Sequence, residues 1–268
     1  MAAITKPLNE INARKFIDVA RKGCYISYDR FPQEQLADYR NTPIQEMLDK
    51  FGKQYADYLN CTLQMAKIRN ACEIVSRKLD VSDPIRQWSR DLAAQSMGCG
   101  YPMELTSKVF LQTFARNRPV VRLSIYSSVA ENVNHSFLIS GDIDHITKSC
   151  TSGGNKLTDL LNKLRNCTIL DPFVNSFCRV ENFESSATNQ YLQSIGADSI
   201  ANPEFIKPSS EALAQYGYIS KVANNIVNEA SRILDNPINT NERIERLRYL
   251  VLNANARFEP ASRRIFSI

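Results

Sequence analysis

The sequence lacks any paired-cysteine motif. Seven cysteines are scattered through 268 residues, and no two of them form a C-x-x-C pair. An odd and dispersed set argues against a disulfide framework and against a zinc ribbon. We therefore predict free thiols, no metal or other cofactor, and a reducing cytosolic compartment as the place of action.

Long apolar runs and long runs of like charge are also missing. No stretch approaches the eighteen or so apolar residues of a membrane helix, and residues 1–10 lack the apolar core of a signal peptide. The net charge of +5 is modest, and no run of five or six like charges occurs. We predict no membrane span and no nucleic-acid partner. The arginines between residues 243 and 264 are interpreted as a solvated face rather than a patch for an anionic partner.

The patterns that are present predict an α+β fold. Helical spacing covers residues 8–22, 33–39, 43–79, 85–95, 103–116, 157–164, 209–234 and 240–257, with 43–79 readable as one helix or two. Strand patterns cover residues 119–127, 134–140 and 166–173. We predict an N-terminal helical region at 1–95, an α+β core at 96–183 and a C-terminal helical region at 184–268, packed as one compact unit.

Cys99 is the residue around which we predict a site. It lies within Ser96–Pro102, where glycines stand on both sides of it and a helical pattern follows at once. Glycine permits a sharp turn and Pro102 suits a first helical turn, so the thiol is expected at a helix start. Free amides and the helix dipole there favour a thiolate, which lowers a cysteine pKa below its reference of about 8.5. The plain alternative is a small buried hydrophobic residue.

His135 and Asp171 stand at the ends of two predicted strands. His135 opens strand 134–140, and Asp171 closes the next strand before Pro172 turns the chain out of the sheet. If the two strands pair, Asp171 accepts a hydrogen bond from one ring nitrogen of His135, and the other nitrogen faces Cys99. That is the arrangement of a nucleophile, a base and a group that orients the base. Taken singly, His135 also fits a satisfied strand histidine, and Asp171–Pro172 a turn.

Three segments together resemble the core of the papain-like and transglutaminase-like superfamily: the surroundings of Cys99, Asn134–Phe137 and Leu170–Phe173. The resemblance covers residues 95–175 and implies a helix packed on a small antiparallel sheet, with helical extensions on both sides. Similar members include cysteine proteases, transglutaminases and glutamine deamidases, several of them bacterial effectors. The chain departs from animal transglutaminases, which usually carry tryptophan where Gly100 stands, and from papain-type enzymes in the spacing of the oxyanion glutamine.

The resemblance implies a cysteine-dependent acyl transfer on a protein substrate, with Cys99, His135 and Asp171 as the catalytic triad. The Cys99 thiolate attacks a carboxamide or peptide carbonyl, His135 protonates the departing amine, and water or an amine resolves the thioester. The backbone N–H of Cys99 is the expected oxyanion donor, with Gln95 as a second candidate. Deamidation, cross-linking and proteolysis stay open, as does secretion into a host cytoplasm without a cleaved signal peptide. The alternative function is a non-catalytic helical protein-binding module.

One further segment carries candidate metal ligands. Gly141–His145 contains two aspartates and a histidine, but it has neither the spacing of a calcium loop nor paired histidines at helical spacing. We interpret it as a polar turn.

Overall fold

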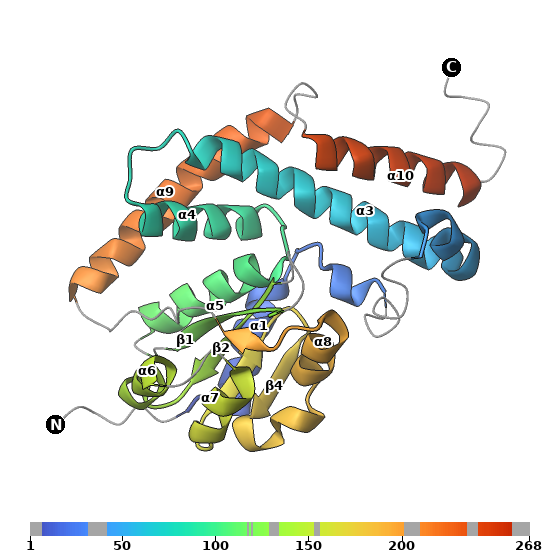
Figure 1. Cartoon of the computed structure of the whole chain (residues 1–268). Helices are drawn as coiled ribbons and strands as arrows, with labels where there is room; N and C mark the ends of the chain where they lie inside the picture. The colour runs from blue at the N-terminus through green and yellow to red at the C-terminus, as the bar shows by residue number, and fades with distance from the viewer. Residues whose placement is uncertain are drawn as a thin grey trace.

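The computed structural model describes residues 7–31, 42–116, 118, 120–128, 134–152, 156–200, 210–234 and 241–258. Figure 1 shows a layer of long helices above a smaller unit built on a sheet. The predicted α+β class is confirmed. The helix expected at residues 33–39 lies outside the described residues.

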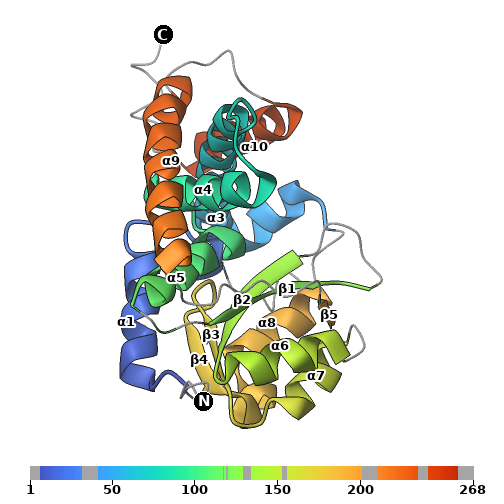
Figure 2. The same ribbon diagram turned by 90° about the vertical axis from the view of Figure 1, so that its left-hand side faces the viewer.

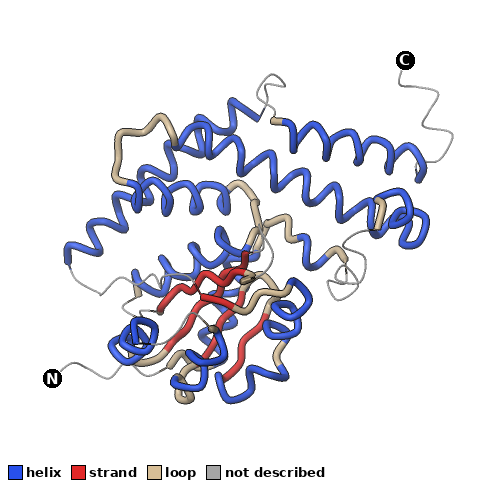
Figure 3. The backbone as a smooth tube through the Cα atoms, viewed as in Figure 1, coloured by secondary structure: helices blue, strands red, loops and turns tan. Residues whose placement is uncertain are grey.

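The sheet has five strands in the order β4-β3-β2-β1-β5, and every pairing is antiparallel. Figure 3 shows these strands gathered in one part of the molecule. The strands are β1 (Val121–Tyr126), β2 (Asn134–Ser140), β3 (Thr168–Asp171), β4 (Ser176–Arg179) and β5 (Ser199–Ile200). The sequence predicted β1, β2 and β3. It missed β4 and β5, which span four and two residues and are too short to show alternation.

Helices cover both faces of the sheet, so its central strand is buried on both sides. On one face lie α1 (Glu10–Arg21) and α5 (Pro102–Ala115), and on the other lie α6 (Ile143–Ser152), α7 (Leu157–Lys163) and α8 (Ala187–Ile195), as Figure 2 shows. Along β2, Leu138 belongs to the first apolar core, whereas Phe137 and Ile139 belong to the second. This is the period-two alternation of a strand between two cores.

The helical layer consists of α3 (Ile44–Ser76), α4 (Asp83–Ser96), α9 (Ser210–Leu234) and α10 (Glu242–Phe258). The open question over residues 43–79 resolves to two helical stretches within α3, separated by a kink at Gly52, whose φ is 54° and ψ −132°. Helix α10 packs along α3, while α9 packs on α3 and α4. None of the helices in the described part of the chain has both the length and the apolarity needed to cross a membrane.

The predicted regions are joined by packing. Helix α1, from the predicted N-terminal region, contacts β3 and β4, and α9, from the C-terminal region, shares the first core with α4 and α5. Two short 3-10 helices are also present: η1 (Ser27–Asp29) follows α1, and η2 (Val180–Ser185) lies between β4 and α8. The fifth strand lies beyond residue 183, so the sheet is larger than the predicted core.

A fully buried arginine ties the two layers together. Arg122 of β1 lies 3.6 Å from the carboxylate of Asp91 on α4 and donates a 2.5 Å hydrogen bond to the Ser107 hydroxyl on α5. Its guanidinium also lies over the ring of Trp88, 3.8 Å from the centroid. A buried charge needs such partners, because an unpaired one costs several kcal/mol.

Candidate functional site

The structure brings His135 and Asp171 together. Strands β2 and β3 pair as expected, with Leu138 opposite Leu170. His135 Nε2 lies 2.7 Å from Asp171 Oδ2, and both side chains are fully buried. The geometry is that of a strong, charge-assisted hydrogen bond in a dry environment.

The carboxylate of Asp171 is held in place by the turn that follows it. Its Oδ1 atom accepts hydrogen bonds from the backbone N–H groups of Phe173, at 3.1 Å, and Val174, at 3.4 Å. From the other side, Arg21 Nη1 donates to the carbonyls of Pro172, at 2.5 Å, and Phe173, at 2.8 Å. Pro172 directs the chain out of the sheet, and the turn that results places the backbone N–H groups beside Asp171 and the carbonyls beside Arg21. The partner that orients His135 is therefore itself fixed.

His135 lies where the two apolar cores meet at one end of the sheet. Its ring centroid is 5.8 Å from that of Phe173 and 5.0 Å from that of Tyr191, which pack with the first core. It is 6.4 Å from the ring of Phe137, which belongs to the second core. The second ring nitrogen, Nδ1, is buried and has no hydrogen-bond partner among the described residues. With Nε2–H donating to Asp171, Nδ1 is the nitrogen able to accept a proton.

Cys99 is placed in the first core and is not brought to His135 in this conformation. Its side chain is fully buried, and Sγ donates to the carbonyl of Met65 at 3.7 Å. The Ser136 hydroxyl, next to His135, lies 3.0 Å from that of Thr106 on α5. Successive side chains of a strand point to opposite faces, so the imidazole is directed away from the face that α5 covers.

The expected lowering of the Cys99 pKa is wrong. Burial raises the pKa of this thiol well above its usual value, and the Glu104 carboxylate adds to the rise. The N–H of Tyr101 and the Arg69 guanidinium act in the opposite direction on the same pKa, but less strongly. Cys99 does precede the first residue of α5, as predicted, yet Tyr25 and Met65 cover that helix start. Desolvation therefore outweighs the available amide.

Neither expected oxyanion donor is free in this structure. The backbone N–H of Cys99 donates to the Ala94 carbonyl at 2.8 Å, continuing the end of α4. The Gln95 side-chain amide donates to the Ala20 carbonyl at 3.0 Å. Both groups hold helix ends together, a role that the sequence spacing did not reveal.

Glu104 is a buried ionisable group that sequence reasoning missed. It is fully buried, and burial raises the pKa of its carboxyl to about 7, against the lowering effect of Arg69, whose Nε lies 3.1 Å from Oε1. A carboxylate in the first turn of a helix is common and usually exposed, so its position carried no signal. Arg21 was missed as well, because nothing in a basic last turn of α1 points to a contact about 150 residues away.

The Gly141–His145 segment forms the start of α6. Asp142 Oδ1 accepts hydrogen bonds from the backbone N–H groups of Asp144, at 3.0 Å, and His145, at 3.2 Å. His145 Nε2 lies 3.0 Å from the carbonyl of Lys163. The polar residues interpreted as a turn thus cap a helix. Across the described residues, no three His, Cys, Asp or Glu side chains gather in a way that could hold a metal ion.

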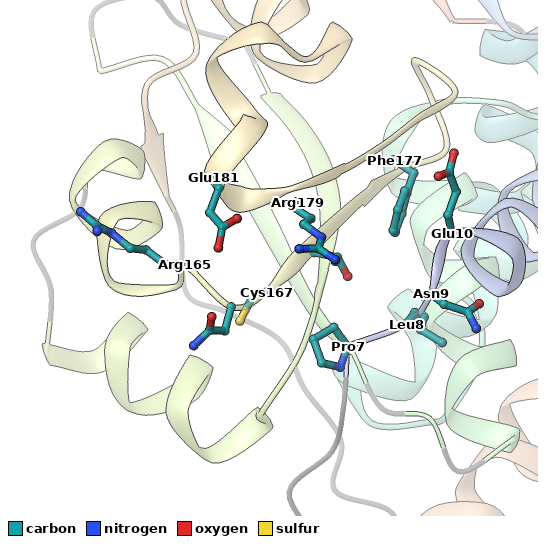
Figure 4. Close-up of a pocket in the computed structure, with 11 residues that line it drawn as sticks. Pro7, Leu8, Asn9, Glu10, Arg165, Cys167, Phe177, Arg179 and Glu181 are labelled. Atoms are coloured by element: carbon teal, nitrogen blue, oxygen red, sulfur yellow. The ribbon is translucent and has the colours of Figure 1, made fainter.

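A cavity of about 510 Å³ lies at the other end of β3 from Asp171. Figure 4 shows the residues that line it. Pro7 and Leu8 lie on one side of it, and Arg165, Cys167 and Glu181 lie across from them. None of Cys99, His135 and Asp171 lines this cavity. It is therefore separate from the His135–Asp171 pair.

No protein-family model, curated protein or solved structure matches this chain. The resemblance to papain-like and transglutaminase-like enzymes accordingly rests on the sequence segments around Cys99, His135 and Asp171 alone.

Proposed function

We propose that this protein is a cysteine-dependent acyl-transfer enzyme with a papain-like or transglutaminase-like core, acting on a protein substrate. The observation that carries the proposal is the 2.7 Å contact between His135 and Asp171, with no described residue bonded to Nδ1 of the same imidazole. A buried base held by an anchored carboxylate is the pairing that activates a nucleophile. Cys99 is the proposed nucleophile.

The packing of α5 supports this choice of nucleophile. Thr106, in the early part of α5, contacts Ser136, the neighbour of His135. Cys99 lies directly before that helix, so the helix start and the imidazole belong to the same end of the sheet. The described conformation is closed, because the sulfur is covered and its thiol is neutral. Nδ1 is also buried, and the imidazole is directed away from the face that α5 covers. Catalysis therefore requires both the segment around Cys99 and Gly100 and the packing around His135 to rearrange, so that the sulfur meets Nδ1.

In the open state the chemistry proceeds by general-base and covalent catalysis. The Cys99 thiol transfers its proton to His135 Nδ1 while Asp171 accepts the hydrogen bond from Nε2–H. The sulfur attacks the carbonyl carbon of a glutamine side chain or peptide, and the imidazolium returns the proton to the departing ammonia or amine. Water then releases a carboxylic acid from the thioester, or an amine releases an amide. A bacterial effector acting in a reducing host cytosol is the setting that the resemblance implies.

Alkylation with iodoacetamide at neutral pH tests the proposal. We expect Cys99 to react faster than the other buried cysteines, and His135→Ala to abolish the difference. Cys72→Ala is the matched control, since Cys72 is also fully buried on the same core and burial raises the pKa of its thiol to about 12. Intact mass measured on glutamine-containing proteins should then show a gain of about one dalton, a cross-link or a cleavage.

A result in which Cys99→Ala retains full activity on an identified substrate contradicts the proposal. Equal alkylation rates for Cys99 and Cys72, unchanged by His135→Ala, also count against it. They favour the second candidate, a non-catalytic protein-binding module. The observation behind that candidate is the burial and neutrality of Cys99, together with two exposed apolar side chains on α10, Tyr249 and Leu252.

A further inference from the structure

A second cavity, of about 360 Å³, lies in the helical layer between α3, α4 and the start of α10. None of Cys99, His135 and Asp171 lines it. The side chains that give it its character are four arginines, one glutamate and a tyrosine: Arg69, Arg77, Arg90, Arg243, Glu73 and Tyr101. We call it the arginine cavity.

The single glutamate of the arginine cavity is already shared. Glu73 Oε1 lies 3.0 Å from Arg77 Nε, and Glu73 Oε2 lies 2.8 Å from Arg90 Nη1. Arg69 faces Glu104 in the core behind the cavity. Arg90 also pairs with Asp91 Oδ1, 2.8 Å from its Nη2. Three of the four arginines are therefore paired with acids, and the excess of positive charge comes from Arg243.

Arg243 is the fourth arginine, and the start of α10 fixes its position. Asn241 Nδ2 donates to Asn70 Oδ1 on α3 at 2.9 Å, and Asn241 Oδ1 accepts from the N–H of Ile244 at 3.0 Å. The first turn of α10 is thus both capped and anchored to α3. Arg243 is exposed and forms no ion pair with any described residue, as the solvated face suggested by the sequence implies. It also lines the cavity, which the sequence did not indicate.

Tyr101 supplies a neutral donor on the same wall. Its hydroxyl is buried and has no hydrogen-bond partner among the described residues. The guanidinium of Arg69 lies 5.3 Å from the centroid of its ring. A buried hydroxyl without a partner costs about 1–3 kcal/mol, so a ligand that accepts its hydrogen bond gains from it.

We propose that the arginine cavity binds a ligand through a phosphate group. Arginine matches phosphate geometry with paired N–H donors. Arg243 has no ion pair among the described residues, and Arg69 and Arg77 each pair with a carboxylate through Nε. The lining therefore favours an anion with more oxygens than a carboxylate offers. The volume admits a phosphate with a small attached group. The cavity includes neither His135 nor Asp171, and binding of a phosphate group there does not depend on the proposed catalysis.

Titration calorimetry on the full chain tests the site, with inorganic phosphate and adenosine monophosphate as probes and ionic strength held constant with chloride. We expect dissociation constants of about 1 mM or below. Arg243→Ala should weaken binding by about tenfold or more, and Tyr101→Phe by several-fold. Arg246→Ala is the matched control, because Arg246 is an exposed arginine on the same helix outside the cavity, and it should bind as the wild type does.

Tighter binding of the nucleotide than of phosphate identifies the attached group as part of the ligand, and equal binding shows that the phosphate alone is recognised. Both outcomes support the site if Arg243→Ala weakens the binding of the probe. Two results overturn it: no binding of either probe up to on the order of 20 mM, or equal losses in Arg243→Ala and Arg246→Ala, which indicate diffuse attraction. Unchanged thermal midpoints of the variants show that they are folded.

Discussion

The carboxylate of Asp171 satisfies three donors at once. They are His135 Nε2–H and the backbone N–H groups of Phe173 and Val174. Because all of them are buried, removing the acceptor leaves several polar groups without partners. The residue therefore stabilises the turn as well as the imidazole.

We expect Asp171→Ala to lower the free energy of unfolding by about 3–5 kcal/mol. Asp171→Asn keeps one carbonyl oxygen as an acceptor for the two backbone N–H groups, and its free energy of unfolding should fall markedly less. Urea unfolding followed by circular dichroism measures both values. An alanine variant within about 0.5 kcal/mol of the wild type would show that the turn relaxes without its acceptor.

The carboxyl of Glu104 makes stability depend on pH. Burial raises its pKa from 4.5 to about 7 in the folded protein, while the unfolded chain keeps the lower value. The folded state therefore holds a proton that the unfolded state has lost between these values. Its stabilising contribution is complete below pH 4.5 and is lost as the pH rises through 7.

Glu104→Gln should remove this dependence. We expect the difference in unfolding free energy between variant and wild type to shift in favour of the variant by about 2–3 kcal/mol from pH 4.5 to pH 8. Urea titrations of both proteins at the two pH values measure it. A constant difference across that range means that the carboxyl is ionised throughout.

At the scale of elements, Gly100 sets how closely α5 approaches the connection after α1. A Cβ atom there would lie 2.4 Å from the carbonyl oxygen of Tyr25 and 2.6 Å from Cγ1 of Ile26. Gly217, in α9, has nothing within 4 Å of its Cβ position. The two glycines therefore respond in opposite ways to the same added methyl group.

We expect Gly100→Ala to destabilise the protein by about 1–3 kcal/mol, because backbone must shift to admit the methyl group. Gly217→Ala should stabilise it by about 0.5–1 kcal/mol, since alanine is the better helix former. Thermal unfolding of the two variants beside the wild type shows whether each substitution raises or lowers the stability. A neutral Gly100→Ala would mean that the segment before α5 already moves freely, as the proposed opening of Cys99 needs.

The longer elements could be predicted from the sequence, and the short ones could not. The spacing of apolar residues predicted α3, α5 and β2, since each is long enough to show its period. The pairing of His135 with Asp171 also followed from the ends of two strands. The burial of the Cys99 side chain could not be predicted from the sequence, because Met65 and Tyr25, which cover it, come from segments far away in the chain. A helix start visible in sequence says nothing about what covers it.

For the whole molecule, the buried Arg122 makes the helical layer and the sheet interdependent. It contacts Asp91 and Ser107 on two helices, and Trp88, the only tryptophan, lies against it. The first apolar core also draws residues from α1, α3, α5 and α9. Neither layer has a complete interior without the other.

We therefore expect one cooperative unfolding transition. Tryptophan fluorescence, which reports on Trp88 at the junction, and far-ultraviolet circular dichroism, which reports on all helices, should give coincident midpoints in urea. Arg122→Met should lower both midpoints together by leaving Asp91 without this partner, at a cost of about 3–5 kcal/mol. A fluorescence change that precedes the loss of helix would show that the layers come apart first.

Helix α1 is synthesised long before strands β3 and β4, which it contacts. The N–H of Leu8, just before it, bonds to Ser140, 132 positions later, and Arg21 bonds to the carbonyl of Pro172, 151 positions later. At translation rates of about 5–20 residues per second, the first of these contacts waits roughly 7–26 s. Throughout that interval its apolar side, including Phe16 and Ile17, has no sheet to cover. Nascent chains halted before residue 134 should therefore remain open to proteases and chaperones along this helix.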